Sequence, residues 1–411
     1  MLLYTLGIRF YHTAAKVISP FNTKAKLFSQ GRKNLFERIK EKVNPDNHNV
    51  WFHVASLGEF EQGRPVMEEI KKRNPEVKII LTFFSPSGYE IRKNYAGADA
   101  IFYMPEDTPS SAAKFLDSVN PKAVYFVKYD FWYNILNEVH RRGIPLYIFS
   151  SIFKENQIFF KFYGVKYRKI LKFFTRIFVQ DQNSIDLLKS HGIDLCLTAG
   201  DTRFDRVCQI TQNSKDIPVA ENFAADKPVI VAGSTWPPDE KILFNIAPEL
   251  NSEFGVKFIV APHEIHESHL AQIEKLSTLK TVRFSKVKPD DDLTDIQVLI
   301  IDNIGMLSSL YRYGKIAYIG GGFGVGIHNT LEAVSYAIPV AFGPNYKKFK
   351  EACDLINRGG AFSITNDEEL NTIFTSLLSD PDALKKAGDI SLAYVNQNLG
   401  ATDIILSNSA Y

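Results

Sequence analysis

The stretch from Ala317 to Pro344 constrains the fold more than any other part of the chain. A short apolar strand, predicted over 316–319, leads into a glycine-rich loop at 320–326 and a helix that carries Glu332 about one turn from its start. A second apolar strand, 339–342, ends in Gly343-Pro344. Strand, loop, helix and strand in this order form the unit of a doubly wound parallel sheet. The glycines either let the backbone approach a ligand closely, with the helix start offering N–H groups to a phosphate, or serve the turn alone.

The same alternation recurs along the chain. Further apolar runs, each followed by a polar or glycine-containing loop and a helical pattern, predict strands at 50–56, 78–83, 100–104, 123–128, 146–150, 176–180, 228–232, 257–261 and 298–301. This order is typical of Rossmann-like parallel sheets. The 411 residues suffice for two such domains, and the polar segment 211–227 is the expected linker. We therefore predict one domain at 1–210 and a second at 211–385. The remaining residues, 386–411, are predicted to form a helical tail, and one option is that this tail crosses back to the first domain.

Composition and charge exclude several classes of protein. With 45% apolar and 23% charged residues, the chain resembles an ordinary globular protein, and a net charge of +2 argues against a general polyanion binder. The sequence has no run of about 18 apolar residues, so we expect no membrane-spanning helix. The N-terminus lacks the features of a signal peptide. The cysteines, Cys196, Cys208 and Cys353, have no metal-ligand spacing and indicate a reducing compartment without a disulfide framework.

Two segments combine aromatic and basic residues. Residues 1–45 mix apolar side chains such as Leu3 and Phe10 with many cations, among them Lys24, Lys26 and Arg32. This pattern favours a helix lying on an anionic bilayer, although a terminal helix packed on its own domain is the alternative. In the second segment, 159–176, the aromatic positions fit a buried helix face, and the basic ones then form an outward cationic patch that suits phosphate groups. Nucleic acid also suits such interleaving, but no RNA-binding motif accompanies it, so we expect no nucleic-acid partner.

Resemblance to a known family begins in the stretch described first. Gly-Gly followed by His328-Asn329-x-Leu-Glu, then Pro-Val-x-Phe-Gly-Pro, resembles the nucleotide-binding half of bacterial 3-deoxy-D-manno-octulosonic acid (Kdo) transferases. The likeness covers most of the chain, and its other motifs are His53 to Glu59, Thr82 to Gly88, Pro105 with Asp107, Asp130 to Asn134, Gly200 to Asp205, Gly233 to Thr235, and Asp302 with Gly305. The implied fold is α/β of the GT-B type, with two Rossmann-like doubly wound parallel-sheet domains facing a central cleft.

The resemblance implies a function for the whole chain. It is transfer of Kdo from CMP-Kdo to a lipid A precursor, lipid IVA, in lipopolysaccharide biosynthesis, by a peripheral protein on the cytoplasmic face of the inner membrane. No cofactor and no metal are expected. In this family a glutamate at the end of the first strand is the proposed general base, a role that carries to Glu59. The alternative interpretation is that Glu59 only stabilises the start of a helix, through the helix dipole.

Further site residues are predicted in both domains. Asp130 would orient the base or the acceptor, or would only cap a helix. The other predicted contacts are Ser56, Gly58, Lys161 and Arg168 with the acceptor; Ser234, Thr235 and Asn329 with the phosphate; Glu332 with the ribose; Gly320, Gly321 and Gly322 beneath the nucleotide; and His263 with the base or a phosphate. Ser234 and Thr235 precede a predicted helix, where free N–H groups favour anions.

Some positions depart from the family pattern. Lys128 stands where an acid is common, Met306 replaces a glutamate, and Pro262-His263-Glu264 replaces Pro-Arg-His, so the arginine is absent. These departures affect the predicted phosphate contacts more than they affect the predicted fold. Two rival hypotheses therefore stay open: a GT-B enzyme or epimerase that uses a UDP- or GDP-sugar, and a non-catalytic membrane-associated scaffold.

Overall fold

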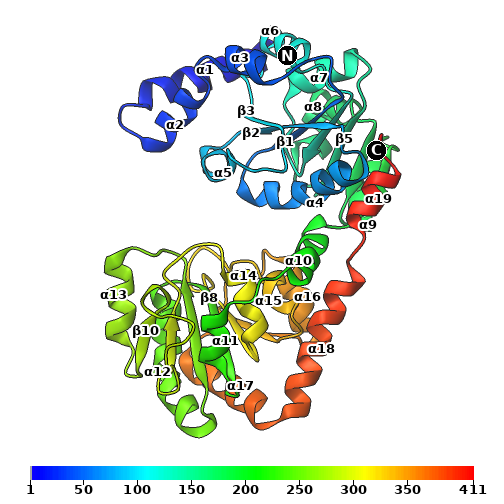
Figure 1. Ribbon diagram of the computed structural model, residues 1–411. Coiled ribbons are helices and arrows are strands. Elements are labelled where there is room, and N and C mark those ends of the chain that lie inside the picture. Colours follow the sequence, from blue (N-terminus) through cyan, green and yellow to red (C-terminus); the bar gives the residue numbers. More distant parts are fainter. Residues whose placement is uncertain (1) are drawn as a thin grey trace. The chain divides into compact units, whose positions relative to one another are not determined.

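The computed structural model describes residues 2–411, which divide into two compact units. The first unit comprises the residues up to Arg206 together with 398–411, and the second comprises 207–397. Each contains one seven-stranded sheet in which every strand pair is parallel, with helices on both faces (Figure 1). The predicted α/β architecture with two doubly wound parallel sheets is confirmed.

The first sheet has the strand order β3-β2-β1-β4-β5-β6-β7. Its strands are β1 (Asn49–Val54), β2 (Lys78–Phe83), β3 (Ala100–Tyr103), β4 (Ala123–Val127), β5 (Leu146–Ser151), β6 (Arg176–Val179) and β7 (Cys196–Thr198). Its helices are α1 (Leu2–Ile18), α2 (Thr23–Gly31), α3 (Leu35–Lys42), α4 (Leu57–Arg73), α5 (Pro86–Arg92), α6 (Pro109–Val119), α7 (Tyr133–Arg141), α8 (Val165–Leu171), α9 (Gln182–Ser190), the start of α10 (Thr202–Gln212), and α19 (Ala401–Ser407).

The second sheet has the order β10-β11-β9-β8-β12-β13-β14. Its strands are β8 (Val229–Thr235), β9 (Lys257–Pro262), β10 (Thr281–Arg283), β11 (Val298–Ile300), β12 (Ile316–Ile319), β13 (Val340–Phe342) and β14 (Ala361–Ser363). Its helices are α11 (Pro218–Ala224), α12 (Pro237–Phe254), α13 (Glu267–Leu276), α14 (Leu307–Leu310), α15 (Leu331–Val334), α16 (Lys350–Arg358), α17 (Asp367–Ser379) and α18 (Pro381–Gln397).

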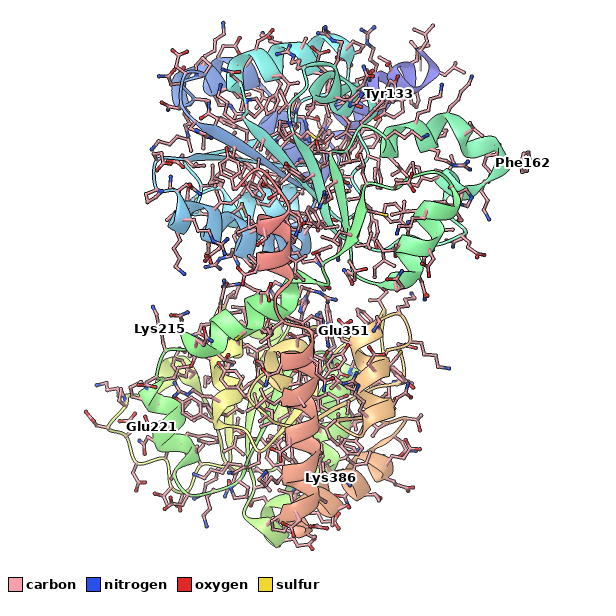
Figure 2. All side chains as sticks on the ribbon, turned by 90° about the vertical axis from the view of Figure 1, so that its right-hand side faces the viewer. Tyr133, Phe162, Lys215, Glu221, Glu351 and Lys386 are labelled. Carbon is pink, nitrogen blue, oxygen red and sulfur yellow. The ribbon has the colours of Figure 1, made fainter. Side chains whose placement is uncertain are left out.

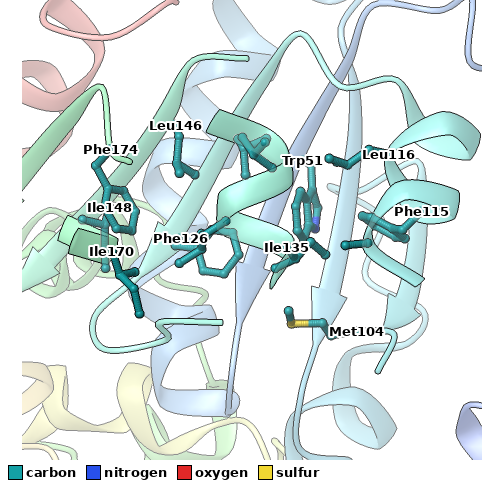
Figure 3. Packing of buried hydrophobic residues seen from close by; sticks show 14 of the residues in the cluster. Trp51, Met104, Phe115, Leu116, Phe126, Ile135, Leu146, Ile148, Ile170 and Phe174 are labelled. Atoms are coloured by element: carbon teal, nitrogen blue, oxygen red, sulfur yellow. The ribbon is translucent and has the colours of Figure 1, made fainter. Parts of the chain in front are cut away.

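Both faces of the first sheet are buried, which is why its strands read as continuous apolar runs. Trp51 in β1 packs into a cluster on one face with Phe115 and Phe126 (Figure 3). Its neighbours Val50 and Phe52 belong to the cluster on the other face, because successive side chains of a strand point in opposite directions. Two buried layers therefore hold β1 rigidly and fix the position of the loop that follows it.

The segment expected to be a linker is only partly irregular. Residues 218–224 of the predicted 211–227 linker form helix α11, which starts with Pro218 and buries Val219, Ala220 and Phe223. A proline at the first helical position is favourable, since its missing N–H has no intrahelical partner there. The polar residues around α11 hid this short apolar face, and the linker prediction was wrong over this helix.

Candidate functional site

The strand order of the first sheet reverses between β1 and β4, and the loops after these two strands carry the predicted acids. Such a reversal is where open α/β sheets bind ligands, at the carboxyl ends of their strands. Glu59 lies in the first turn of α4, directly after β1. Its Oε2 accepts hydrogen bonds from the backbone N–H of Ala55 at 2.5 Å and of Ser56 at 3.1 Å. One oxygen of the Glu59 carboxylate thus caps the N-terminus of α4.

The other oxygen of Glu59, Oε1, has no hydrogen-bond partner among residues 2–411. Burial, and next the neighbouring Asp130 carboxylate, raise the pKa of Glu59, while the Ala55 amide, His53 and Lys128 partly offset this. A raised pKa brings a carboxylate closer to the basicity that general base catalysis needs near neutral pH. The helix-capping role and a catalytic role are therefore compatible, because they use different oxygens.

A hydrogen-bonded relay beneath Glu59 holds Asp130. The Nε2 of buried His53 lies 2.8 Å from the Asp130 carboxylate, and its Nδ1 lies 2.9 Å from the hydroxyl of Thr82. That hydroxyl accepts from the indole N–H of Trp51 at 2.8 Å. Because a carboxylate only accepts, the Nε2–H of His53 donates to Asp130. The Thr82 hydroxyl accepts from Trp51 and has two acceptors for its own hydrogen, His53 Nδ1 at 2.9 Å and the Phe52 carbonyl at 3.3 Å. These contacts hold His53, and through it Asp130, in place.

The sequence interpretation did not include His53 or Thr82 among the site residues. They are paired across β1 and β2 in the same register position, within otherwise apolar strands. Two polar residues inside buried central strands were the available signal, since buried polar groups are nearly always hydrogen-bonded. Which partner each would find depended on the pairing of β1 with β2 and β4.

The predicted acceptor contacts lie in different surroundings. Ser56 and exposed Gly58 flank Glu59 at the start of α4. Arg168 donates from Nε to the Phe159 carbonyl at 2.7 Å and so braces its own segment, whereas Lys161 is half-buried at the turn before α8. The aromatic residue Phe162 is 91% exposed and projects from the fold (Figure 2).

One of the motif acids, Asp107, serves as a structural anchor. Asp107 accepts from the Asn134 and Ile135 N–H groups at the start of α7 and from the Tyr4 hydroxyl at 2.6 Å. Burial raises the pKa of Asp107, and these hydrogen bonds oppose that shift. The carboxylate therefore ties α1 to the start of α7, which begins three residues beyond Asp130.

In the second sheet the order reverses between β8 and β12, and the glycine-rich loop follows β12. A Cβ on Gly320 would lie 2.2 Å from the Ser234 carbonyl oxygen, and one on Gly322 would lie 2.6 Å from the Gly343 backbone. Gly321, with φ of +90°, donates its N–H to the buried Asp239 carboxylate at 2.9 Å. The glycines thus bring the loop against β8 and β13, as a close turn requires.

A hydrogen-bonded pair of nearly parallel rings, Trp236 and His328, bridges this reversal. The Trp236 indole N–H donates to Nε2 of His328 at 3.0 Å, and the two ring planes differ by 10°. His263, exposed after β9, stacks on both rings, with centroids 4.8 Å from Trp236 and 4.4 Å from His328. Burial, and next the adjacent His263, lower the pKa of His328 to about 4, so His328 is neutral at physiological pH. Of these three rings, the sequence analysis gave a ligand-binding role to His263 alone, although His328 was part of a family motif.

The predicted phosphate contacts after β8 differ from one another. Ser234 adopts φ of +54°, an uncommon conformation for a residue with a side chain and one that clusters at functional sites. Thr235 is fully buried and its hydroxyl donates to Glu240 at 2.9 Å, so that hydroxyl supports the loop instead of facing a ligand. Glu240 also contacts His269 Nε2 at 2.9 Å, and the pair fixes the start of α12.

The helix that carries Glu332 is shorter than expected. α15 spans only Leu331–Val334, so Glu332 lies at its second residue and not one turn inside. Asn329 donates to the Glu332 carboxylate at 2.9 Å, and its own carbonyl oxygen accepts from the Leu331 N–H at 3.1 Å. The Asn329 side chain thus makes hydrogen bonds to Leu331 and Glu332 that a preceding helical turn would otherwise make. The prediction that Glu332 lies one turn inside the helix was wrong.

Residues 2–411 contain no cluster of three or more His, Cys, Asp or Glu side chains placed to hold a metal ion. No helix within that range combines the length and apolarity needed to cross a membrane.

Comparison with known proteins decides the family. The family model described as 3-deoxy-D-manno-octulosonic-acid transferase matches residues 31–206. The 3-deoxy-D-manno-octulosonic acid transferase of Aquifex aeolicus is 30% identical over 367 residues, covering 87% of this chain and 95% of the relative. The chain belongs to the Kdo transferase family. The Chlamydia muridarum enzyme of the same name is 25% identical, with 83% of this chain and 80% of the relative covered. This Kdo transferase family member is accordingly a glycosyltransferase.

Solved structures agree on the fold. UDP-GlcNAc 2-epimerase from Neisseria meningitidis has a TM-score of 0.62 at 18% identity, covering 88% of this chain and 99% of that protein. Acinetobacter baumannii MurG has a TM-score of 0.53 at 12% identity, with the same coverages. At these identities the likeness shows the GT-B fold alone, which confirms the predicted fold class.

Proposed function

We propose that the protein transfers Kdo from CMP-Kdo to a lipid A precursor, with Glu59 as the general base. The observation that carries this proposal is the Glu59 carboxylate at the reversal of the first sheet, with one oxygen held by Ala55 and Ser56 and the other open. Its raised pKa suits proton abstraction. Asp130, oriented by His53, tunes this carboxylate and positions the acceptor.

In the proposed reaction, an acceptor hydroxyl gives its proton to Glu59 as its oxygen attacks the anomeric carbon of Kdo. The bond between that carbon and the phosphate oxygen of CMP breaks, and CMP leaves with the bonding electron pair. One base and correct positioning suffice for a leaving group of this kind, and general base catalysis typically contributes about 10²–10⁴-fold. The relatives' name supports the transferred sugar.

The second unit supplies the proposed donor contacts. His263, backed by the Trp236 and His328 rings, is exposed at the reversal of that sheet and would meet the anionic part of the nucleotide sugar. Ser234, Asn329 and the Gly320–Gly322 backbone would contact the phosphate, and Glu332 would bind the ribose. Thr235 would act through its support of the Ser234 loop.

The N-terminal helices support a peripheral membrane location for the proposed enzyme, on the cytoplasmic face of the inner membrane. Leu3, Phe10 and Phe21 expose 85%, 76% and 91% of their surface, beside exposed Lys24 and Lys26. Apolar side chains in the bilayer and lysines at anionic headgroups are the arrangement that peripheral helices use.

The decisive experiment offers the purified protein a lipid A precursor with CMP-Kdo, UDP-GlcNAc or GDP-mannose in separate reactions. We expect a product mass increased by Kdo with CMP-Kdo alone, and its loss in Glu59→Gln. Transfer from UDP-GlcNAc or GDP-mannose would instead support a changed donor. An absence of transfer from all three donors by folded protein would contradict the proposal and favour a scaffold.

A further inference from the structure

An apolar groove of about 450 Å³ opens between α1, α2 and the loop after β2. Its volume falls within the roughly 300–1,000 Å³ of small-molecule sites. Helices α1 and α2 lie next to each other here (Figure 1). The apolar lining comes from Ala14, Ala15, Ile18, Ala25, Phe28 and Phe84. Small residues on both helices keep the groove open.

The groove lies against the loop that positions the proposed base. Its wall residue Ser85 donates its N–H to the Ala55 carbonyl at 2.8 Å, and the Ala55 N–H in turn donates to Glu59. Phe84 of the same wall packs on Trp132, two residues after Asp130, at 4.7 Å between ring centroids. A ligand in the groove therefore lies on the loops that carry both site acids.

The residues in and around the groove suit an amphipathic ligand. Lys24 lines it and forms no ion pair within residues 2–411. On the other side of Phe28, a second hollow of about 550 Å³ has basic and acidic residues in its lining, among them Lys33 and Glu37, and Lys16 pairs there with Glu106 at 3.9 Å. Phe28 thus separates an apolar compartment from a polar one, and exposed Lys24 beside the apolar compartment suits a molecule with a hydrocarbon chain and an anionic head.

We propose that the groove between α1 and α2 binds one acyl chain of the glycolipid acceptor. This inference rests on the proposed function, since it assumes that the acceptor is a lipid. The apolar lining, the unpaired Lys24 at its side and the hydrogen-bonded link to Ala55 carry the assignment. The groove would select acylated acceptors and place their sugar near Glu59.

The first test measures binding without any transfer. Dodecyl phosphate and butyl phosphate share one headgroup and differ in chain length, so calorimetry below the micelle concentration isolates the chain. Wild type should bind dodecyl phosphate more tightly, and Ala15→Trp should weaken that binding at least about tenfold, because each methylene left in water forfeits roughly a fourfold factor. Thr13→Trp, exposed on the same helix, is the matched control and should retain wild-type affinity.

Equal binding of both phosphates by wild type, or undiminished dodecyl phosphate binding by folded Ala15→Trp, would overturn the proposal. Circular dichroism establishes folding, and Ala25→Trp on α2 fills the groove from the other side if Ala15→Trp does not fold. Both filled-groove variants should lose affinity while retaining helix content.

The second test separates an acceptor chain from a chain of the surrounding bilayer. Transfer to an acylated acceptor and to its acyl-free counterpart is compared in wild type and Ala15→Trp. The ratio of kcat/KM for the acylated over the acyl-free acceptor should fall about tenfold or more, as each lost methylene contact removes roughly a fourfold factor. An unchanged ratio with weaker vesicle binding would overturn the acceptor assignment, whereas failure of wild type to use either acceptor would count against the proposed function itself.

Discussion

The two oxygens of Glu59 have different surroundings in the structure, so one can cap α4 while the other serves the proposed base role. Oε2 accepts from Ala55 and Ser56, the pattern of a helix-start acid, while the pKa shift arises from burial and from Asp130. Removal of the Asp130 charge should therefore change the base without disturbing the helix start.

Asp130→Asn should lower the pKa of Glu59, because it removes a negative charge that raises it. A base must be ionised, so kcat/KM is lost as pH falls through the Glu59 pKa, and in Asp130→Asn this loss should occur at a lower pH. Turnover should also fall, since Asp130 contacts the reacting groups in the proposed mechanism. The measurement is the pH profile of kcat/KM, and an acid limb that does not move would argue against Glu59 as the titrating base.

Glu332 is the residue proposed to bind the ribose of the nucleotide. Glu332→Ala should weaken CMP binding by roughly 10- to 150-fold, which corresponds to the loss of a charge-assisted hydrogen bond worth about 1.5–3 kcal/mol. Glu253→Ala, exposed near the end of α12, provides the control and should bind CMP as wild type does. Calorimetry that gives equal affinities for both variants would place the ribose contact elsewhere.

At the scale of secondary structure, α1 and α2 present cations of two kinds. Arg32, counted among the surface cations in the sequence, donates to the Phe28, Phe84 and Met104 carbonyls and lies 3.7 Å over the Phe28 ring. Its charge holds α2 on the first unit. Lys24, Lys26 and Lys33 are exposed and are the residues available to a bilayer.

Replacement of Lys24, Lys26 and Lys33 with glutamine should weaken sedimentation with anionic vesicles on the order of 100-fold at low salt. Each lysine near such a surface contributes about 1 kcal/mol, and salt screens that contribution. The control replaces Lys275, Lys286 and Lys288 in the second unit, which changes net charge equally. Identical vesicle binding by both triple variants would mean that the N-terminal lysines form only a solvated face.

At the scale of the whole molecule, the C-terminal segment joins the first unit. Both Asp205 oxygens are used: they accept from the Gly400 N–H and from the N–H and hydroxyl of Thr402, each at 2.7 Å. α19 packs on α4, the helix that begins with the Glu59 loop. Asp205, part of a motif that suggested family membership, therefore acts as a structural anchor for the tail.

Asp205→Ala should destabilise the first unit by about 1.5–3 kcal/mol or more, since it removes hydrogen bonds to a charged acceptor. For a unit of this size that is a lowering of Tm by roughly 3–12 °C. Asp403→Ala is the control, because the Asp403 side chain is 74% exposed in its pair with Arg73 and such surface pairs contribute little. Differential scanning calorimetry with equal Tm values for the two variants would contradict an anchoring role.

The strands missed from the sequence share a position in the sheets. β7, β10 and β14 are three residues long and lie at sheet edges, whereas the predicted strands include all the central ones. Central strands are buried on both faces and give apolar runs that can be recognised locally. An edge strand such as Cys196–Thr198 is partly exposed, so its residues look like those of a loop.

The sequence by itself determined the features that short stretches encode: two parallel sheets, the family motifs, and Glu59 and the glycine-rich loop at strand ends. Tertiary structure decided the partners. His53 meets Asp130 across 77 residues and Trp236 meets His328 across 92, because strand order brings β1 beside β4 and β8 beside β12. Local periodicity carries no information about that order, so it cannot say which polar side chains meet. The groove between α1 and α2 likewise exists only once helices distant from β2 pack against the loop that follows it.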